Sequence, residues 1–210
     1  MICLSDNDII KKLAFCDLLA EALQVLETSF GDVFVLNSAR YVLLKPIKKP
    51  ETAKAKLGAA VFDRLSNFLG SVQTLNVQPS LDEQRIFDDM LGIDTGEAIL
   101  FSASALFSDF VLATSDKNSL RALASSSACQ PIRQRLSNRV ICFEQVILRL
   151  VNQIGFDFVR ARVVPALDCD TALRAIFGSG LDATEENVRS GLASYIEGLR
   201  KETETLLVEA

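Results

Sequence analysis

Short apolar segments alternate with longer helical segments along this chain, and this alternation is the feature that most constrains its fold. Four segments, 1–5, 32–38, 71–77 and 110–115, are short and rich in apolar or β-branched residues, as expected of buried strands. The segments between them carry apolar residues at helical spacing or strong helix formers. Strands that alternate with helices form α/β folds, so we predict a mainly parallel sheet of about four to five strands flanked by helices.

Three further segments are less clear. Residues 140–155 fit either a strand that passes into a helix or one long helix, because their apolar pattern suits both. Residues 156–164, FDFVRARVV, are interpreted as a final strand or an edge element, and residues 125–139 as loop and turn.

The pattern divides the chain into two predicted parts. Residues 1–155 form the α/β domain, and residues 156–210 form a helical extension that packs on it. The last predicted helix, 184–209, has a set of apolar positions that can pack on the domain or on another subunit: Leu192, Tyr195, Ile196, Leu199 and Leu206.

Composition excludes several classes of enzyme. The chain has 210 residues, a net charge of -5 and no histidine, which excludes Ser-His-Asp hydrolases, Cys-His proteases and zincins. Any catalysis must therefore come from carboxylates, a thiol, a lysine or a metal-bound water. The acidic net charge argues against a general nucleic-acid coat but allows a local acidic pocket that binds metal.

The cysteines indicate a reducing compartment, and the hydropathy pattern bears on membrane insertion. The five cysteines form no C-x-x-C pair and lie in apolar surroundings, as expected of reduced thiols in a cytoplasmic protein. We expect no signal peptide, because the first residues lack a basic region, and no membrane span, because no apolar window reaches ~18 residues.

Acidic residues lie at three predicted junctions. The first strand runs into Asp6 and Asp8, the helix after residue 94 begins with Asp94 and Glu97, and the fourth strand runs into Asp116. In a parallel sheet such residues meet beyond the carboxyl ends of the strands. Carboxylates from separate junctions can share a Mg²⁺ or Mn²⁺ ion, which prefers oxygen ligands.

A simpler explanation exists for each acid on its own. Aspartate is a favoured helix N-cap, and acids in a first turn complement the helix dipole. Ser5 or Asp6 can cap the first helix, Asp116 can cap the helix that follows it, and Asp94 with Glu97 has the spacing of a capping box. Only the occurrence of acids at all three junctions favours a shared site over three separate caps.

Two segments resemble the PIN-domain nucleases. They are LSDNDIIKKL at 4–13 and GIDTGEAILFSASALFSDFVLATSDKNSL at 92–120, and their order and spacing match a subgroup with a D-x-G-E-A segment followed by T-x-D-K. The resemblance covers about residues 1 to 155. It implies a parallel sheet between helices and a metal-dependent nuclease with Mg²⁺ or Mn²⁺ as cofactor.

The resemblance also implies roles for particular residues. Asp6, Glu97 and Asp116 are the expected catalytic residues and metal ligands, with Asp8 assisting. The family usually adds a glutamate in the helix after the second strand, but residues 37–47 contain no acid. The residues expected to contact RNA are Ser115, Asn118, Arg133 and Arg135, together with Arg139.

We therefore expect a cytoplasmic ribonuclease, of the kind found in toxin–antitoxin or defence systems. Its expected partners are single-stranded or structured RNA, and a protein partner or second copy of the chain, with no membrane. The absent fourth acid favours an alternative, a catalytically degenerate module that binds RNA or protein. A third reading is an α/β protein whose acids only cap helices.

Overall fold

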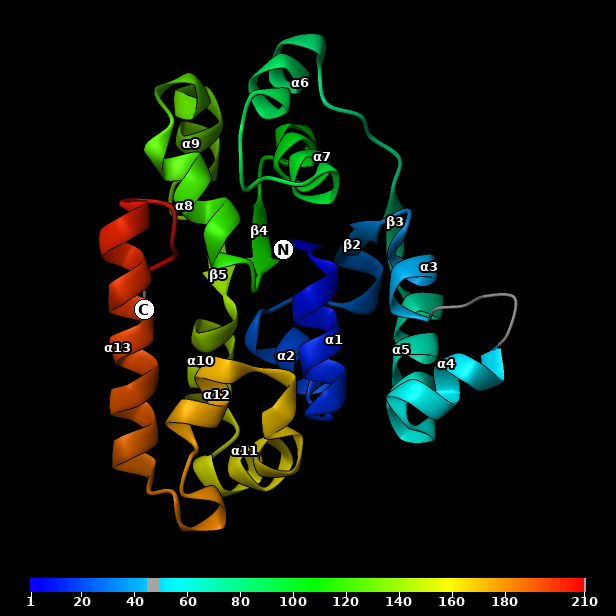
Figure 1. The fold of residues 1–210 in the computed structure, drawn as a ribbon, viewed down its shortest axis with the longest axis vertical. Helices are drawn as coiled ribbons and strands as arrows, with labels where there is room; N and C mark the ends of the chain where they lie inside the picture. The colour runs from blue at the N-terminus through cyan, green and yellow to red at the C-terminus, as the bar shows by residue number, and fades with distance from the viewer. Residues whose placement is uncertain (45–49, 210) are drawn as a thin grey trace.

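A computed structural model gives the fold of residues 1–44 and 50–209. Its centre is a five-stranded sheet in which every pair of neighbours is parallel, with the order β3-β2-β1-β4-β5 (Figure 1). The strands are β1 (Ile2–Ser5), β2 (Val33–Leu36), β3 (Gln73–Leu75), β4 (Phe110–Thr114) and β5 (Val140–Cys142). The predicted α/β class and parallel sheet are confirmed.

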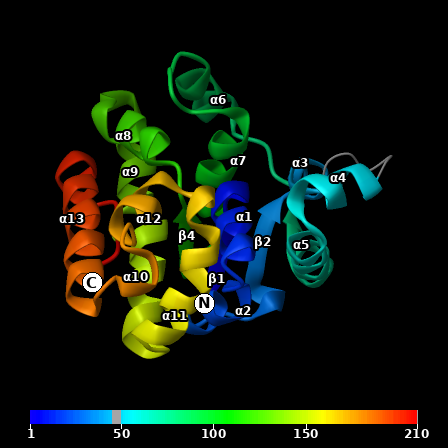
Figure 2. The same ribbon diagram turned by 60° about the horizontal axis from the view of Figure 1, so that its bottom comes forward.

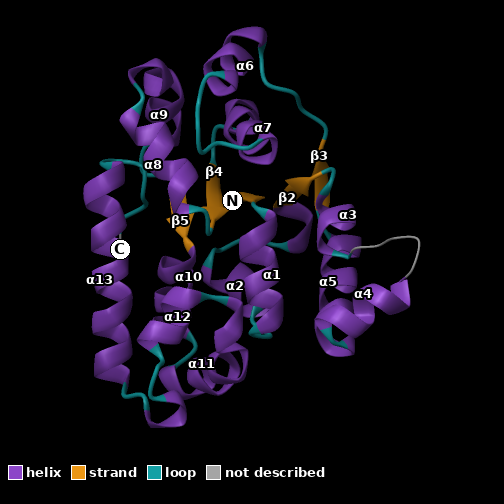
Figure 3. Cartoon of the chain, in the orientation of Figure 1, coloured by secondary structure: helices purple, strands orange, loops and turns teal. Residues whose placement is uncertain are grey.

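Helices surround the sheet, as Figure 3 shows. The α-helices of the described residues are α1 (Asn7–Phe15), α2 (Leu19–Val25), α3 (Ala39–Leu43), α4 (Pro50–Leu57), α5 (Ala59–Ser71), α6 (Leu81–Asp88), α7 (Thr95–Ala103), α8 (Lys117–Ser125), α9 (Gln130–Leu136), α10 (Phe143–Gln153), α11 (Phe156–Val163), α12 (Thr171–Ile176) and α13 (Glu185–Thr203). Short 3-10 segments connect several of them, including η4 (Val164–Cys169). None of the helices in this described part of the chain is long and apolar enough to cross a membrane.

Successive strand residues pack into two separate cores. Cys3, Val111 and Ile141 belong to a cluster with residues of α1, α2 and α10, whereas Leu4 and Leu112 belong to a second cluster with residues of α7, α8 and α9. Neighbouring residues of a strand point to opposite faces of the sheet, so the two clusters lie on opposite faces. Both faces are therefore covered, which explains why the strands are almost entirely apolar.

The strand register brings three helix starts to one edge of the sheet. Ser5 at the end of β1 is level with Ala113 of β4, and Thr114 is level with Cys142 of β5. Helices α1, α8 and α10 begin within three residues of these strand ends. Their first turns consequently lie side by side at the carboxyl edge.

Two predicted assignments are wrong. Residues 156–164 are not a strand, because Phe156–Val163 form α11, in which Arg160 stacks on Phe156 and Arg162 on Phe158. These pairs are four residues apart, a spacing at which side chains meet only on a helix. Within the predicted loop 125–139, Gln130–Leu136 form α9, with a proline at its first turn, where proline is tolerated.

The carboxy-terminal residues pack closely on the rest of the molecule. Helix α13 lies beside α10 and α8 at the β5 side, away from α4 and α5 (Figure 1, Figure 2). It ends at Thr203 rather than near residue 209, and Leu207 then forms a parallel bridge with Val140 of β5. Four of the five apolar positions predicted to pack are buried, and Tyr195 is 40% exposed. The division into domains 1–155 and 156–210 stays a prediction.

Candidate functional site

A pocket of about 380 Å³ opens at the carboxyl edge of the sheet. The acids that line it come from all three junctions predicted from the sequence: Asp6, Asp8, Asp94, Glu97 and Asp116. Acids from the three junctions thus line one pocket, and their role as a shared site stays a prediction. The hydrogen bonds of each acid determine which of its carboxylate oxygens are free to bind a ligand.

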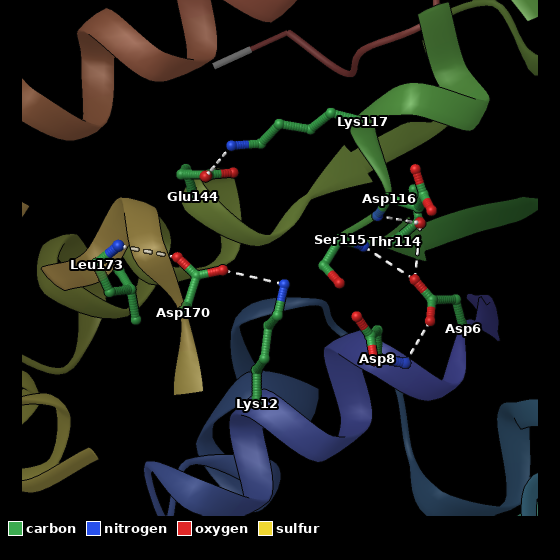
Figure 4. A network of polar contacts seen from close by, with 10 residues as sticks. All are labelled: Asp6, Asp8, Lys12, Thr114, Ser115, Asp116, Lys117, Glu144, Asp170 and Leu173. Atoms are coloured by element: carbon green, nitrogen blue, oxygen red, sulfur yellow. Dashed lines mark hydrogen bonds and ion pairs between the residues drawn. The ribbon is translucent and has the colours of Figure 1, made fainter. Parts of the chain in front are cut away.

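Asp6 joins the ends of β1 and β4. It caps α1, and its Oδ1 accepts the backbone N–H of Asp8. Its Oδ2 accepts the Thr114 hydroxyl at 2.7 Å and the Ser115 N–H at 2.9 Å (Figure 4). Burial raises the pKa of Asp6, although these donors oppose the shift. Asp6 is thus a buried acid with both oxygens engaged.

Asp116 caps α8 and contacts the same threonine. Its Oδ1 accepts the N–H groups of Asn118 at 2.8 Å and Ser119 at 3.0 Å. Its own N–H donates to the Thr114 hydroxyl at 3.0 Å, so Thr114 connects the two aspartates (Figure 4). The cap is real, but it occupies only one of the two carboxylate oxygens of Asp116.

Glu97 faces Asp116 from α7. Asp94 and Glu97 form a reciprocal capping box, in which the Glu97 N–H donates to Asp94 Oδ1 at 2.8 Å and the Asp94 N–H donates to Glu97 Oε2 at 2.7 Å. Burial, followed by the hydrogen bond and charge of Asp116, raises the pKa of Glu97 to about 8. With a pKa of about 8, Glu97 holds its proton at neutral pH unless a cation replaces it.

The start of α7 packs closely on the end of β2 at Gly96, where a side chain would require Leu36 to shift. A Cβ on Gly96 would lie 2.9 Å from Leu36 Cδ1 and 3.2 Å from Asp94 Oδ1. The glycine of the D-T-G-E-A segment therefore allows Glu97 to approach the end of the sheet.

The raised pKa of Glu97 predicts a pH-dependent stability in the absence of metal. An acid with a raised folded pKa stabilises the fold fully below its ordinary pKa of 4.5 and loses that contribution as pH rises towards about 8. Glu97→Gln keeps the capping-box acceptor without the charge. We expect this variant to exceed the wild type in stability above pH 8 by on the order of 1 kcal/mol, because water screens a half-buried carboxyl.

Chemical denaturation in EDTA at pH 5 and pH 8.5 measures this difference. The advantage of Glu97→Gln over the wild type should grow between the two pH values. Equal advantages at both would show that Glu97 is ionised in the folded protein throughout this range.

The pocket has the oxygen ligands that a divalent cation prefers, but their present positions do not form a complete metal site. Hard oxygen donors line the pocket, and the Glu97–Asp116 pair repels itself unless it holds a proton or a cation. Within residues 1–44 and 50–209, however, no three acidic, cysteine or histidine side chains are grouped closely enough to hold an ion. Glu97 and Asp116 are the ready pair, and Asp6 or Asp8 would have to turn towards it.

The side of the pocket next to β2 carries no acid in the part of the chain that is described. Leu36, Ser38 and Val42 line it there, between β2 and the end of α3. Where the resemblance leads us to expect a fourth acid, the described part of the pocket therefore has only uncharged side chains. Residues 45–47 of the segment without acids lie outside the described residues.

The residues predicted to contact RNA are dispersed. Ser115 lies at the site, and its Oγ is buried with no hydrogen-bond partner among the described residues. Asn118 is exposed and accepts a hydrogen bond from Arg121 at 3.2 Å. Arg133 and Arg135 on α9 do not line the acidic pocket. Their role in binding RNA stays a prediction.

The arginines of this region bond within the protein. Arg135 donates to Ser104 Oγ at 2.7 Å, to the Phe101 carbonyl at 3.0 Å and to Glu83 at 2.8 Å. Arg133 and Arg139 each donate to a backbone carbonyl at 2.6 Å. Each of these three arginines therefore has hydrogen-bond acceptors within the protein.

Sequence reasoning missed a group of charged residues next to the site. Glu144, in the first turn of α10, is 1% exposed and pairs with Lys117, while its Oε2 is buried without a partner in the described structure. Lys12 Nζ lies 3.0 Å from Asp170 Oδ2 (Figure 4). Burial opposes the charge of Lys12, but the hydrogen bond and charge of Asp170 outweigh it and raise the Lys12 pKa.

A signal for Glu144 was present in the sequence. It follows the apolar run 140–142 just as Asp116 follows β4, so it is a further junction acid. Glu144 was not predicted as a junction acid because residues 140–155 fitted both one long helix and a strand that passes into a helix. No comparable local signal exists for Asp170, which lies 158 positions from Lys12.

Comparison with known proteins identifies no relative, since no family profile, curated protein or solved structure matches this chain. The geometry and chemistry of the pocket are therefore the basis for any functional conclusion.

Proposed function

We propose that this protein is a PIN-like, metal-dependent ribonuclease that hydrolyses phosphodiesters at the acidic pocket. The observation that carries the proposal is the Glu97–Asp116 carboxyl pair, placed in one pocket with Asp6 and Asp8. These are the positions that the resemblance to PIN-domain nucleases marks as metal ligands. Their hydrogen bonds as helix caps are compatible with this role, because a carboxylate has more acceptor sites than a cap requires.

Each residue of the pocket has a definite task in this proposal. Glu97 and Asp116 would hold Mg²⁺ or Mn²⁺, which supplies a nucleophilic water and stabilises charge on the phosphodiester. Asp6 fixes the distance between β1 and β4 through Thr114 and Ser115. Leu36 and Val42 line the β2 side of the pocket.

The biological setting follows from the same proposal. A small ribonuclease without histidine, in a chain of reduced cysteines, fits a cytoplasmic enzyme of the toxin–antitoxin or defence kind. Its substrate would be single-stranded or structured RNA. An antitoxin-like protein or a second copy of the chain would be its partner.

A cleavage assay tests the proposal. We expect purified protein to cut single-stranded RNA in Mg²⁺ or Mn²⁺ and to stop on addition of EDTA, because the carboxylate pair cannot activate water without the cation. Mock preparations from cells that carry an empty vector control for contaminating nucleases. Absence of cleavage with either ion, on RNA and on single-stranded DNA, would rule out the enzymatic function.

One observation favours a second candidate, a degenerate module that binds RNA or protein without cutting. The β2 side of the pocket offers Ser38 and Val42 in place of an acid, and the described side chains form no ready group of three metal ligands. This candidate predicts RNA binding that is unchanged by EDTA. A mobility-shift assay with and without EDTA separates it from the first.

A further inference from the structure

Two pairs of side chains lie where α1 packs on η4: the charged pair Lys12–Asp170 and the two thiols of Cys16 and Cys169. Lys12 and Cys16 are four residues apart at the end of α1, so they lie on the same side of the helix. Cys169 and Asp170 follow each other at the end of η4. Lys12 pairs with Asp170 at 3.0 Å, and Cys169 packs against the buried cluster that contains Cys16. This contact brings the two thiols together, and each shifts the pKa of the other.

The two thiols differ in access to solvent. Cys16 is 0% exposed, whereas Cys169 is partly exposed and lines a pocket of about 210 Å³ together with Lys12 and Asp168. A small oxidant can therefore reach Cys169 through this pocket, but it cannot reach Cys16 directly. Cys16 belongs to the buried cluster on which Cys169 packs.

The more accessible thiol, Cys169, is also the more acidic of the two. The hydrogen bond with Cys16 lowers the pKa of Cys169 and outweighs burial and the charge of Asp170, which oppose the shift. The charge of Lys12 also favours the Cys169 thiolate. The same hydrogen bond and burial raise the pKa of Cys16. An exposed thiol with thiolate character beside a protected one is the arrangement of an attacking and a resolving cysteine.

The other three cysteines lack such a partner in the described structure. Cys3 and Cys142 are buried, and burial raises the pKa of each to about 12. Cys129 is buried and contacts the sulfur of Met90 at 3.1 Å. They serve as internal controls for any reaction that selects Cys169.

We propose that Cys16 and Cys169 are an oxidation site at which a hydroperoxide forms a disulfide between α1 and the carboxy-terminal segment. The Cys169 thiolate attacks the peroxide oxygen, which gives a sulfenic acid and releases hydroxide, or an alcohol from an organic peroxide. The Cys16 sulfur then attacks the sulfenic sulfur and releases water, and the Cys16 proton goes to the leaving oxygen. The two thiols lose two electrons in total, and the peroxide gains them.

The disulfide tethers two parts of the chain that are far apart in sequence. Helix α1 begins at Asn7, directly after Asp6, and carries Asp8 in its first turn. The disulfide fixes the other end of this helix to the segment that supplies Asp170. Because the closed loop is long, the oxidised protein should melt higher, by about 5 °C or more.

Peptide mapping of the full chain tests the site directly. Trypsin releases each cysteine in a different fragment, with Cys16 in residues 13–40 and Cys169 in residues 163–174. After treatment with one equivalent of hydrogen peroxide and alkylation, we expect these two fragments to be linked and the other three cysteines to be alkylated. Dithiothreitol should separate the fragments and reverse the shift in melting temperature.

Cys169→Ser is the decisive variant, because this side chain is partly exposed and its replacement is tolerated best. It should lose both the linked fragments and the melting shift. The proposal is overturned if wild-type protein forms no 13–40 to 163–174 link while Cys169 becomes sulfinic acid, or if another cysteine forms the link. Both readouts are independent of nuclease activity.

Discussion

Asp116→Asn should abolish metal-dependent RNA cleavage, lowering the rate by about a hundredfold or more, while the fold stays intact. The fold survives because asparagine is as good an N-cap as aspartate, and its Oδ1 can still accept the N–H groups of Asn118 and Ser119. What the variant loses is the charge beside Glu97. Initial rates of RNA cleavage in Mn²⁺, with circular dichroism as a check on folding, measure the effect.

Asp82→Asn is the matched control. Asp82 is an acid in the first turn of α6, it is exposed, and it does not line the acidic pocket. It should cleave at the wild-type rate. If Asp116→Asn also cleaved at that rate, Asp116 would be only a helix cap, and the proposed site would be wrong. Asp6 is a poorer choice for this test, because its removal leaves the buried Thr114 hydroxyl and the N–H groups of Asp8 and Ser115 without this acceptor.

Val42→Glu should place a carboxylate on the β2 side of the pocket, where no acid is described. Val42 is 40% exposed and lines the pocket from α3, on the side where no acid is described. A glutamate there adds a hard oxygen ligand, so we expect the dissociation constant for Mn²⁺ to fall by about tenfold. In EDTA the same change adds repulsion to a crowded acidic site, so the melting temperature should fall below that of the wild type.

Val42→Gln separates charge from side-chain length in this experiment. Calorimetric titration with Mn²⁺ should give tighter binding for the glutamate variant alone. Equal affinities for glutamate and glutamine would show that position 42 does not face a bound ion. The pair of variants also distinguishes an incomplete metal site from a pocket that never held metal.

Asp6, Asp8 and Asp116 were predictable because they follow strands, whereas Asp94 and Glu97 begin a helix that follows α6. The end of a buried apolar run can be located from the sequence, and parallel strands bring such ends together, which is why Asp6 and Asp116 meet through Thr114. Whether each acid is a cap or a ligand was not predictable, because both roles use the same residue at the same place. The structure shows that Asp6 and Asp116 are caps, and that Asp116 has an oxygen left over.

Contacts between distant segments could not be predicted. Lys12 meets Asp170 only because α1 packs on η4, and no local pattern encodes that contact. The helix α11 was predicted as a strand because its aromatic and apolar residues alternate with polar ones at its start. Stacking of arginine on phenylalanine one helical turn away favours the helix instead.

The central claim is that acids from separate junctions hold one divalent ion. Anomalous diffraction from a crystal soaked in Mn²⁺ tests it most directly, since it locates the ion without reference to activity. We expect a peak in the pocket, at about 2 Å from carboxylate oxygens of Glu97 and Asp116, with Asp6 or Asp8 turned towards it. An empty pocket with Glu97 and Asp116 unmoved would contradict the claim and leave these acids as helix caps.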